Sequence, residues 1–185
     1  MYYSRALTDM EFKDIIDCVR NGYLEHKPNE QIATILILEA NLGCRINDII
    51  SLTTDSFIKD GDIWKLNISE QKTRKARYFI VPAPLKDFID QWIEKKGISA
   101  HERLFTVSAA AVWKVLRQVT DFLGLENISS HALRKYAATR LYEATNHDIQ
   151  AVCQFLQHSS PAITARYIRR SDDVLENALQ SIVAL

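Results

Sequence analysis

Cysteine is scarce in this sequence: it has only Cys18, Cys44 and Cys153, and no two of them form a CxxC pair. This excludes a disulfide framework or a common zinc knuckle, and a reducing cytoplasm is the expected compartment. The N-terminus lacks the apolar segment of a signal peptide, and no apolar run is long enough to span a bilayer. We therefore expect no membrane partner.

An excess of charge of one sign is also missing, because 23 basic residues balance 23 acidic ones. The balance argues against a protein that coats nucleic acid by bulk charge. DNA binding stays possible, since a phosphate backbone responds to the local density of Lys and Arg. Basic residues gather in three short stretches, at 72–77, 134–140 and 166–170.

Phosphate-binding loops and clustered carboxylates are absent as well. With five glycines the chain has no Walker-type loop, and its carboxylates are not grouped as a two-metal site would require. We therefore expect no nucleotide and no metal as a cofactor. The chain has 185 residues, 47% of them hydrophobic, which is enough for one soluble domain with a core.

The hydrophobic pattern predicts helices on both sides of a small sheet. Thr8 and Glu11 form a capping box, and the helical spacing of apolar residues predicts helices over 8–22, 28–42, 47–52, 85–96, 109–123, 130–144, 148–156, 163–168 and 172–185. Residues 63–68 and 78–81 predict two strands. The polar, basic segment 71–77 joins them as an antiparallel hairpin. This order of elements predicts a mainly helical α+β domain.

Two arginine patterns suit a phosphate. Arg45 follows the helix-breaking Gly43, and Asp48 lies one short turn later, where its carboxylate could orient the guanidinium toward an anion. Taken alone, the pattern also fits a surface ion pair. His131 and Arg134 are spaced to share one helix face. They fit a phosphate clamp and proton carrier, or simply an exposed basic helix.

A third pattern places a tyrosine among arginines. His158 lies in a turn between two helices, and Tyr167 follows nine residues later. A single tyrosine after an arginine is more often a packing residue with a solvated hydroxyl. This segment therefore carries little weight without the other two patterns.

Together, the three patterns resemble the catalytic domain of tyrosine recombinases, which include phage integrases and fimbrial invertases. The resemblance runs from about residue 7 to residue 170. Arg45 and Asp48 match the G-x-R-x-x-[ED] motif, and Lys72 matches the lysine of the basic hairpin. The H-x-x-R motif, the L-G-H motif and the nucleophile are matched by His131, Arg134, Leu156, His158 and Tyr167. Gln157 replaces the usual glycine of L-G-H.

The resemblance implies a chemistry for each position. Arg45 and Arg134 would grip the non-bridging oxygens of a DNA phosphodiester, and Tyr167 would attack its phosphorus. His131 is the candidate base, and His158 would bond the phosphate. Lys72 is the candidate acid for the 5′-oxygen, with Lys75 as its competitor. The implied product is a 3′-phosphotyrosyl link, made without metal or other cofactor. Further expected DNA contacts are Arg74, Lys75, Arg77, Lys135 and Arg166.

The resemblance also sets expectations for domains and partners. Residues 1–170 would form the catalytic domain, packed with its basic hairpin as in DNA breaking-rejoining enzymes, and no N-terminal core-binding domain precedes it. The chain would be a natural short form or a fragment. Double-stranded DNA is the expected partner, together with other protomers in a tetrameric synapse, and accessory DNA-bending proteins are candidate further partners. The free protein would be monomeric or weakly oligomeric, in the cytoplasm with the nucleoid.

The C-terminal segment 171–185 has an apolar stripe at helical spacing. This helix could pack on its own core or contact a neighbouring protomer.

Three other interpretations stay open from the sequence. Type IB topoisomerases and telomere-resolving enzymes use similar groups but return the strand differently. A DNA-binding regulator could keep the scaffold without the chemistry, although it has no need of a nucleophile. A zinc site built from His131, His147, Cys153 and His158 has spacings that match no common metal site.

Overall fold

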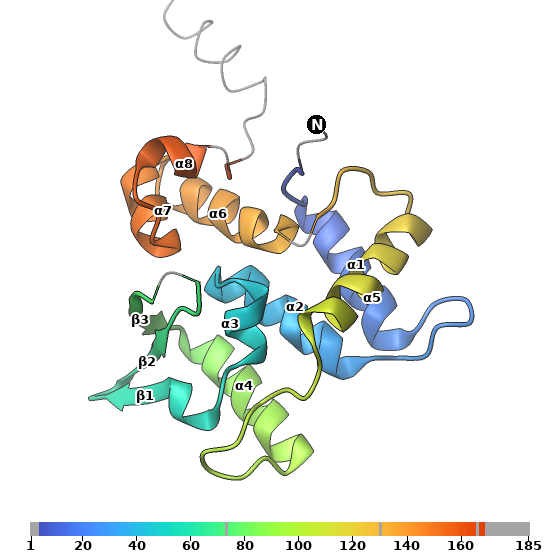
Figure 1. Ribbon diagram of the computed structural model, residues 1–185, viewed down its shortest axis with the longest axis horizontal. Helices are drawn as coiled ribbons and strands as arrows, with labels where there is room; N and C mark the ends of the chain where they lie inside the picture. Colours follow the sequence, from blue (N-terminus) through green and yellow to red (C-terminus); the bar gives the residue numbers. More distant parts are fainter. Residues whose placement is uncertain (1–3, 73, 130, 166, 169–185) are drawn as a thin grey trace, which may run out of the picture.

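The computed structural model describes residues 4–72, 74–129, 131–165 and 167–168 (Figure 1). The predicted tail helix at 171–185 lies outside these residues. In the part of the chain that is described, no helix is long and apolar enough to cross a lipid bilayer.

The N-terminal half begins with three helices, α1 (Asp9–Asn21), α2 (Glu30–Leu42) and α3 (Ile46–Ile50). The predicted capping box of α1 is confirmed, because Thr8 and Glu11 exchange side chain-to-backbone hydrogen bonds of 3.2 and 2.8 Å. Helix α2 is buried over nearly its whole length and forms the centre of the core. Gly43 ends it in the left-handed region at φ 56°.

The sheet has three antiparallel strands in the order β1 (Phe57–Asp60), β2 (Ile63–Ser69) and β3 (Ala76–Val81). The predicted hairpin is confirmed as β2 and β3, with Leu66 opposite Phe79. Strand β1 was not predicted, because its four residues are too few to show an alternating pattern. A 3₁₀ turn (Thr54–Ser56) leads into β1.

Five helices follow the sheet. They are α4 (Ala83–Lys96), α5 (Ala109–Phe122), α6 (Ala132–Ala144), α7 (Ile149–Leu156) and α8 (Pro161–Ala165). Helix α4 begins two residues before its predicted start, with prolines before and within its first turn, where a missing N–H is tolerated. The predicted helix over 163–168 is wrong at its end, because α8 stops at Ala165 and Tyr167 lies in the turn that follows.

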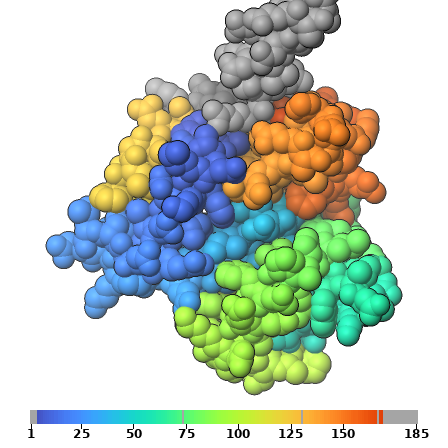
Figure 2. Space-filling view, turned by 180° about the vertical axis from the view of Figure 1, so that it is seen from behind, coloured from blue at the N-terminus to red at the C-terminus, as the bar shows by residue number. Residues whose placement is uncertain are grey.

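Two hydrophobic clusters hold these elements together. The larger cluster contains residues of the sheet and of every helix from α1 through α6. The smaller cluster consists of Ala138, Val152 and Leu156, from α6 and α7, and Tyr167 packs against it. Seen from behind, the N-terminal segment lies between the segments of α5 and α6 (Figure 2). Phe12 of α1 accordingly stacks on Tyr136 of α6 with ring centroids 4.8 Å apart. The mainly helical α+β fold predicted from the sequence is therefore the fold of this chain.

Candidate active site

The site is built around the C-terminal ends of α2 and α7. Gly43 caps α2 at φ 56°, and Gln157 caps α7 at φ 54°, so the backbone turns sharply at both helix ends in the left-handed conformation. Arg45 comes two residues after the first turn, and His158 comes directly after the second. Both helix ends therefore deliver a functional side chain and leave carbonyl groups without helical partners.

Two buried arginines connect these helix ends. Arg77 of β3 donates from Nη2 to the carbonyls of Leu42 and Phe155, at 2.8 and 2.7 Å. Arg134 of α6 donates from Nη1 to the Gly43 carbonyl and from Nη2 to the Leu156 carbonyl, the latter at 2.7 Å. Each guanidinium thus bridges one carbonyl of α2's end and one of α7's end.

Arg134 lies deep in this arrangement. Its side chain is 1% exposed, and burial together with the charges of Arg77 and Arg45 lowers its pKa to about 10. It stays cationic at neutral pH, beneath the site. Its Nε–H has no hydrogen-bond partner among the described residues. An anion brought to this side chain would supply the missing acceptor.

Arg45 is partly exposed and has a buried carboxylate as its partner. Its Nη1 donates to Glu70 Oε2 at 2.5 Å. The prediction that Asp48 orients Arg45 is wrong, because Asp48 Oδ1 instead accepts the backbone N–H of Gln71 at 2.9 Å. Asp48 therefore fixes the base of the hairpin turn against α3, and Glu70 takes the role expected of Asp48.

Glu70 is the site residue that sequence reasoning missed. It is fully buried at the end of β2, beside Arg77 as well as Arg45. It is also the one acidic residue between Asp62 and Asp87, in a segment rich in Lys and Arg. That isolation could have indicated an internal partner for the arginines.

His131 is the residue before α6, at its N-cap position, and it presents its ring at the surface. Desolvation and the positive charges of Arg134, Arg45 and Lys72 lower its pKa. The imidazole is therefore neutral at pH 7 and able to accept a proton. Its predicted partner Arg134 lies in the first turn of α6, but inside the protein.

His158 and Tyr167 lie against each other. Their ring centroids are 4.7 Å apart in an edge-to-face arrangement. His158 Nδ1 lies 3.1 Å from Thr164 Oγ1, and the Tyr167 N–H donates to the Thr164 carbonyl at 2.8 Å. Burial and the charges of Arg134 and Arg45 lower the pKa of His158 to about 4. Thr164 therefore orients both residues from the short helix α8.

Lys135 borders Tyr167 on the α6 side. Its Nζ is 5.8 Å from the centre of the tyrosine ring and donates to the Ser4 carbonyl. Burial lowers the pKa of its ammonium group. Lys135, predicted to contact DNA, is therefore already engaged with the N-terminal segment while adding a cation beside the phenol.

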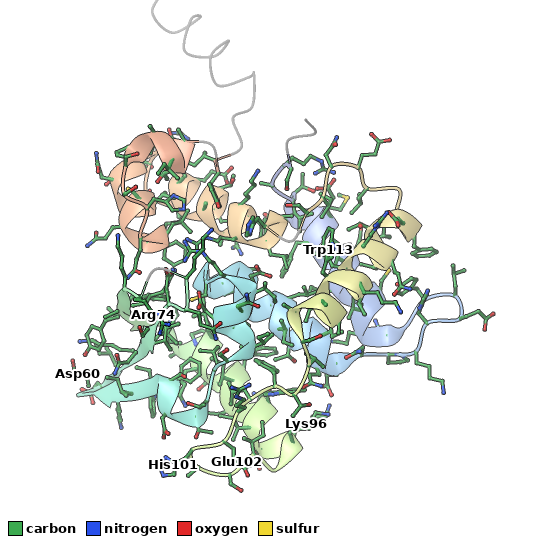
Figure 3. The ribbon with its side chains drawn as sticks, in the orientation of Figure 1. Asp60, Arg74, Lys96, His101, Glu102 and Trp113 are labelled. Carbon is green, nitrogen blue, oxygen red and sulfur yellow. The ribbon has the colours of Figure 1, made fainter. Side chains whose placement is uncertain are left out.

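The hairpin residues divide into exposed and buried ones. Lys72, Arg74 and Lys75 are exposed, and Arg74 lies at the hairpin end of the sheet (Figure 3). The prediction that Arg77 contacts DNA is wrong, because its side chain is 1% exposed and its guanidinium is bonded inside the protein. Arg166, also predicted to contact DNA, lies outside the described residues.

Gln157 shows how the chain accommodates a departure from the L-G-H motif. A non-glycine residue at positive φ is strained, but the Gln157 side chain donates from Nε2 to the Ala76 carbonyl of β3 at 2.7 Å. This bond links the end of α7 to the hairpin. The substitution thus offsets its backbone strain with a contact that glycine could not make.

Within the described residues, no three His, Cys, Asp or Glu side chains are arranged to hold a metal ion. The zinc interpretation built on His131, His147, Cys153 and His158 thus receives no support from the geometry. The carboxylate of Glu70 is bound by arginines instead.

Comparison with known proteins agrees with this arrangement. A sequence model of the phage integrase family matches residues 5–173. The probable integrase/recombinase YoeC of Bacillus subtilis (strain 168) is 31% identical over 163 residues, which is 84% of this chain and 86% of YoeC.

Solved structures of recombinases and integrases share the fold. The recombinase XerH, bound to a palindromic difH substrate in a post-cleavage complex, aligns with a TM-score of 0.77 and 20% identity over 95% of this chain. This chain spans about half of XerH, 52% of its length. The catalytic domain of bacteriophage HP1 integrase aligns with a TM-score of 0.66 and 17% identity, covering 96% of this chain and 94% of that domain.

Proposed function

This chain belongs to the phage integrase family, and from that premise we propose that it cleaves and rejoins double-stranded DNA as a site-specific recombinase with Tyr167 as its nucleophile. The observation that carries the proposal is the edge-to-face contact of Tyr167 with His158, whose pKa is lowered by burial and by the charges of Arg134 and Arg45. A structural tyrosine would not need such a cationic setting. A phosphodiester would find there the positive charge that stabilises its transition state.

The proposed reaction exchanges one phosphodiester for another. The Tyr167 oxygen forms a bond to phosphorus as the bond from phosphorus to the 5′-oxygen breaks, leaving a 3′-phosphotyrosyl link and a free 5′-hydroxyl. The phenol proton passes to neutral His131, and Lys72 supplies the proton that the 5′-oxygen takes up. The link conserves the energy of the broken bond, so attack by a second DNA end completes strand exchange.

Arg45 and Arg134 would stabilise the charge on the non-bridging oxygens. For Arg45 this requires no rearrangement, because its side chain is partly exposed. Arg134 would donate to the phosphate from its unpartnered Nε–H, or from Nη1 after releasing the Gly43 carbonyl. His158, whose Nδ1 lies beside Thr164 Oγ1, would donate a hydrogen bond to the phosphate.

The proposed DNA contacts are the exposed hairpin residues Lys72, Arg74 and Lys75, together with Lys135; Arg166 is a further proposed contact. XerH is described in complex with its DNA substrate after cleavage, which supports DNA as the partner here. Assembly of several protomers on DNA, with or without accessory bending proteins, is part of the same proposal. Such a protein would act in the cytoplasm, where the nucleoid lies.

A nicked suicide substrate tests the proposal, because loss of a short strand after cleavage traps the covalent intermediate. We expect a protein–DNA adduct that survives a denaturing gel with the wild-type chain and is absent with Tyr167→Phe. Tyr142→Phe, in the last turn of α6, serves as the matched control and should form the adduct. An adduct with Tyr167→Phe, or none with the wild type on a substrate that it binds, would overturn the assignment.

A further inference from the structure

Glu70 places a buried negative charge directly under the site. Its side chain is fully buried at the end of β2. One carboxylate oxygen accepts Arg45 Nη1 at 2.5 Å, and the other accepts Arg77 Nη1 at 2.9 Å. A buried carboxylate with two guanidinium partners is a fixed element of the structure, since moving it would leave charges unpaired.

Of the two arginines bonded to Glu70, Arg77 is the more firmly held. Arg77 is held by the carbonyls of Leu42 and Phe155 and lies over the Phe79 and Phe155 rings, at 5.0 and 5.4 Å. Arg45, in contrast, is 21% exposed at its side chain. The buried carboxylate, bonded to a fixed arginine on one side, thus holds the more exposed arginine on the other.

Holding one nitrogen of Arg45 orients the whole side chain. A guanidinium is planar, with five N–H donors in fixed directions. A bond to Nη1 therefore fixes the direction of the other donors, which a phosphate would meet. Glu70 also acts on the rest of the site, because its negative charge raises the pKa of both Arg134 and His158 against the effect of the neighbouring cations.

The backbone of Glu70, unlike its side chain, makes the hydrogen bonds of the hairpin turn. Its N–H donates to the Lys75 carbonyl at 3.0 Å, and its carbonyl accepts the Arg74 N–H at 2.9 Å, which closes the hairpin turn. The turn that carries Lys72 therefore depends on the Glu70 backbone. A change confined to the carboxylate should affect Arg45 and leave the hairpin in place.

We infer that Glu70 is a positioning residue that aims Arg45 at the phosphate of the transition state. The inference rests on the proposed function, in which Arg45 contacts that phosphate. It predicts that the carboxylate contributes to the rate of cleavage and contributes nothing to the affinity for DNA, because removing a negative charge from a cationic site does not weaken its attraction for phosphate.

The test compares Glu70→Gln with the wild type for DNA affinity and for the rate of adduct formation on the nicked substrate. We expect cleavage to be about 10- to 100-fold slower, as for misplacement of a catalytic group by a fraction of an ångström, with a Kd that is unchanged or lower. Asp60→Asn removes the same charge from the other end of the sheet, where Asp60 pairs with Lys65, and should leave both quantities unchanged. Equal cleavage rates for Glu70→Gln and the wild type would overturn the inference.

A substrate with sulfur as the bridging 5′ atom separates Arg45 from Lys72. A thiolate leaves without a proton more readily than an alkoxide, so this substrate should restore cleavage by Lys72→Ala. The defect of Glu70→Gln should persist on it. Restoration of Glu70→Gln to the wild-type rate would show that the carboxylate acts through the acid and would contradict the inference. If the wild type forms no adduct with either substrate, the proposed function fails instead.

Glu70→Gln leaves Arg77 buried beside a neutral amide, so a second pair of variants guards against misfolding. Arg77→Met keeps the bond between Glu70 and Arg45, and the double variant Glu70→Gln/Arg77→Met removes the buried pair altogether. Replacing both members of a buried pair is tolerated better than removing one. The double variant should cleave about 10- to 100-fold more slowly than Arg77→Met, and equal rates for the two would contradict the role of Glu70.

Discussion

His131 and His158 have lowered pKa values for the same physical reasons, desolvation and nearby arginines. Both are therefore neutral at pH 7, although they lie in a cationic site. Neutrality lets His131 accept a proton and lets His158 donate a hydrogen bond without adding to the positive charge. A bound phosphate would favour the protonated forms, so DNA binding and proton uptake are linked at this site.

The lowered pKa of His158 predicts a loss of stability in acid. Its pKa is about 4 in the folded protein against about 6.5 in an unfolded chain. The unfolded state therefore binds the proton first, and the free energy of unfolding falls as the pH drops from about 6.5 toward 4. Between pH 7 and pH 5 we expect His158 to contribute a loss of about 1 to 2 kcal/mol.

Urea unfolding of the wild type and of His158→Gln at the two pH values measures this contribution. The variant should lose less stability than the wild type between pH 7 and pH 5, by the amount just given. His26→Gln, which changes an exposed histidine stacked on Tyr23, should behave as the wild type does. Parallel pH profiles for His158→Gln and the wild type would contradict the assignment.

At the scale of elements, the hairpin determines which lysine can act as the acid. Lys72 and Lys75 are both exposed on it. The charge of Lys72 lowers the pKa of His131, which places this lysine within electrostatic reach of the candidate base. Lys75 lines a groove beside α7, together with Gln154 and His158. We therefore propose Lys72 as the acid.

Lys72→Ala should therefore slow cleavage of a normal phosphodiester by about 10²- to 10⁴-fold, the usual contribution of a general acid. Lys75→Ala, the matched control on the same hairpin, should slow it less than about tenfold, the effect of losing one phosphate contact. Single-turnover adduct formation on the nicked substrate measures both. The reverse order of effects would assign the acid to Lys75.

The sequence predicted the elements better than their contacts, for a physical reason. The helices and the hairpin follow from local patterns, such as the capping box at Thr8 and the glycine that ends α2. Six catalytic positions could be proposed because each lies in a short motif. The pairing of Arg45 with Glu70, and not with Asp48, could not be predicted, because Glu70 lies 25 residues away from Arg45 in the sequence.

The misassignment of Arg77 has the same origin. A basic residue near a basic hairpin is normally solvated, and composition alone cannot show that the carbonyl ends of α2 and α7 converge on it. Burial of Arg77 depends on tertiary packing, which no local pattern encodes. The end of α8 was also mispredicted, since tertiary contacts of Tyr167 compete with its helical propensity.

At the scale of the whole molecule, a chain without net charge brings three arginines together at one site. Arg45, Arg77 and Arg134 come from three distant segments, and a single buried carboxylate offsets part of their repulsion. Their mutual influence appears in the lowered pKa of Arg134. Such a site suits an anion that arrives as a ligand.

The segment after Arg170 is proposed to act between protomers. Its apolar stripe includes Leu175, Leu179 and Ile182 at helical spacing. A chain that ends at Arg170 keeps both hydrophobic clusters of the described fold, so we expect its melting temperature to change little. Its assembly on DNA, measured by sedimentation with a duplex that carries two half-sites, should be weaker than that of the full chain.

A pair of substitutions tests the same segment without shortening it. Leu179→Asp should weaken assembly on DNA as truncation does, because a charge within the apolar stripe opposes burial against a neighbour. Asn177→Asp adds the same charge off the stripe and should assemble as the wild type does. If the segment instead packs on its own domain, Leu179→Asp and truncation should both lower the melting temperature of the free protein. Unchanged assembly with unchanged stability would exclude both roles.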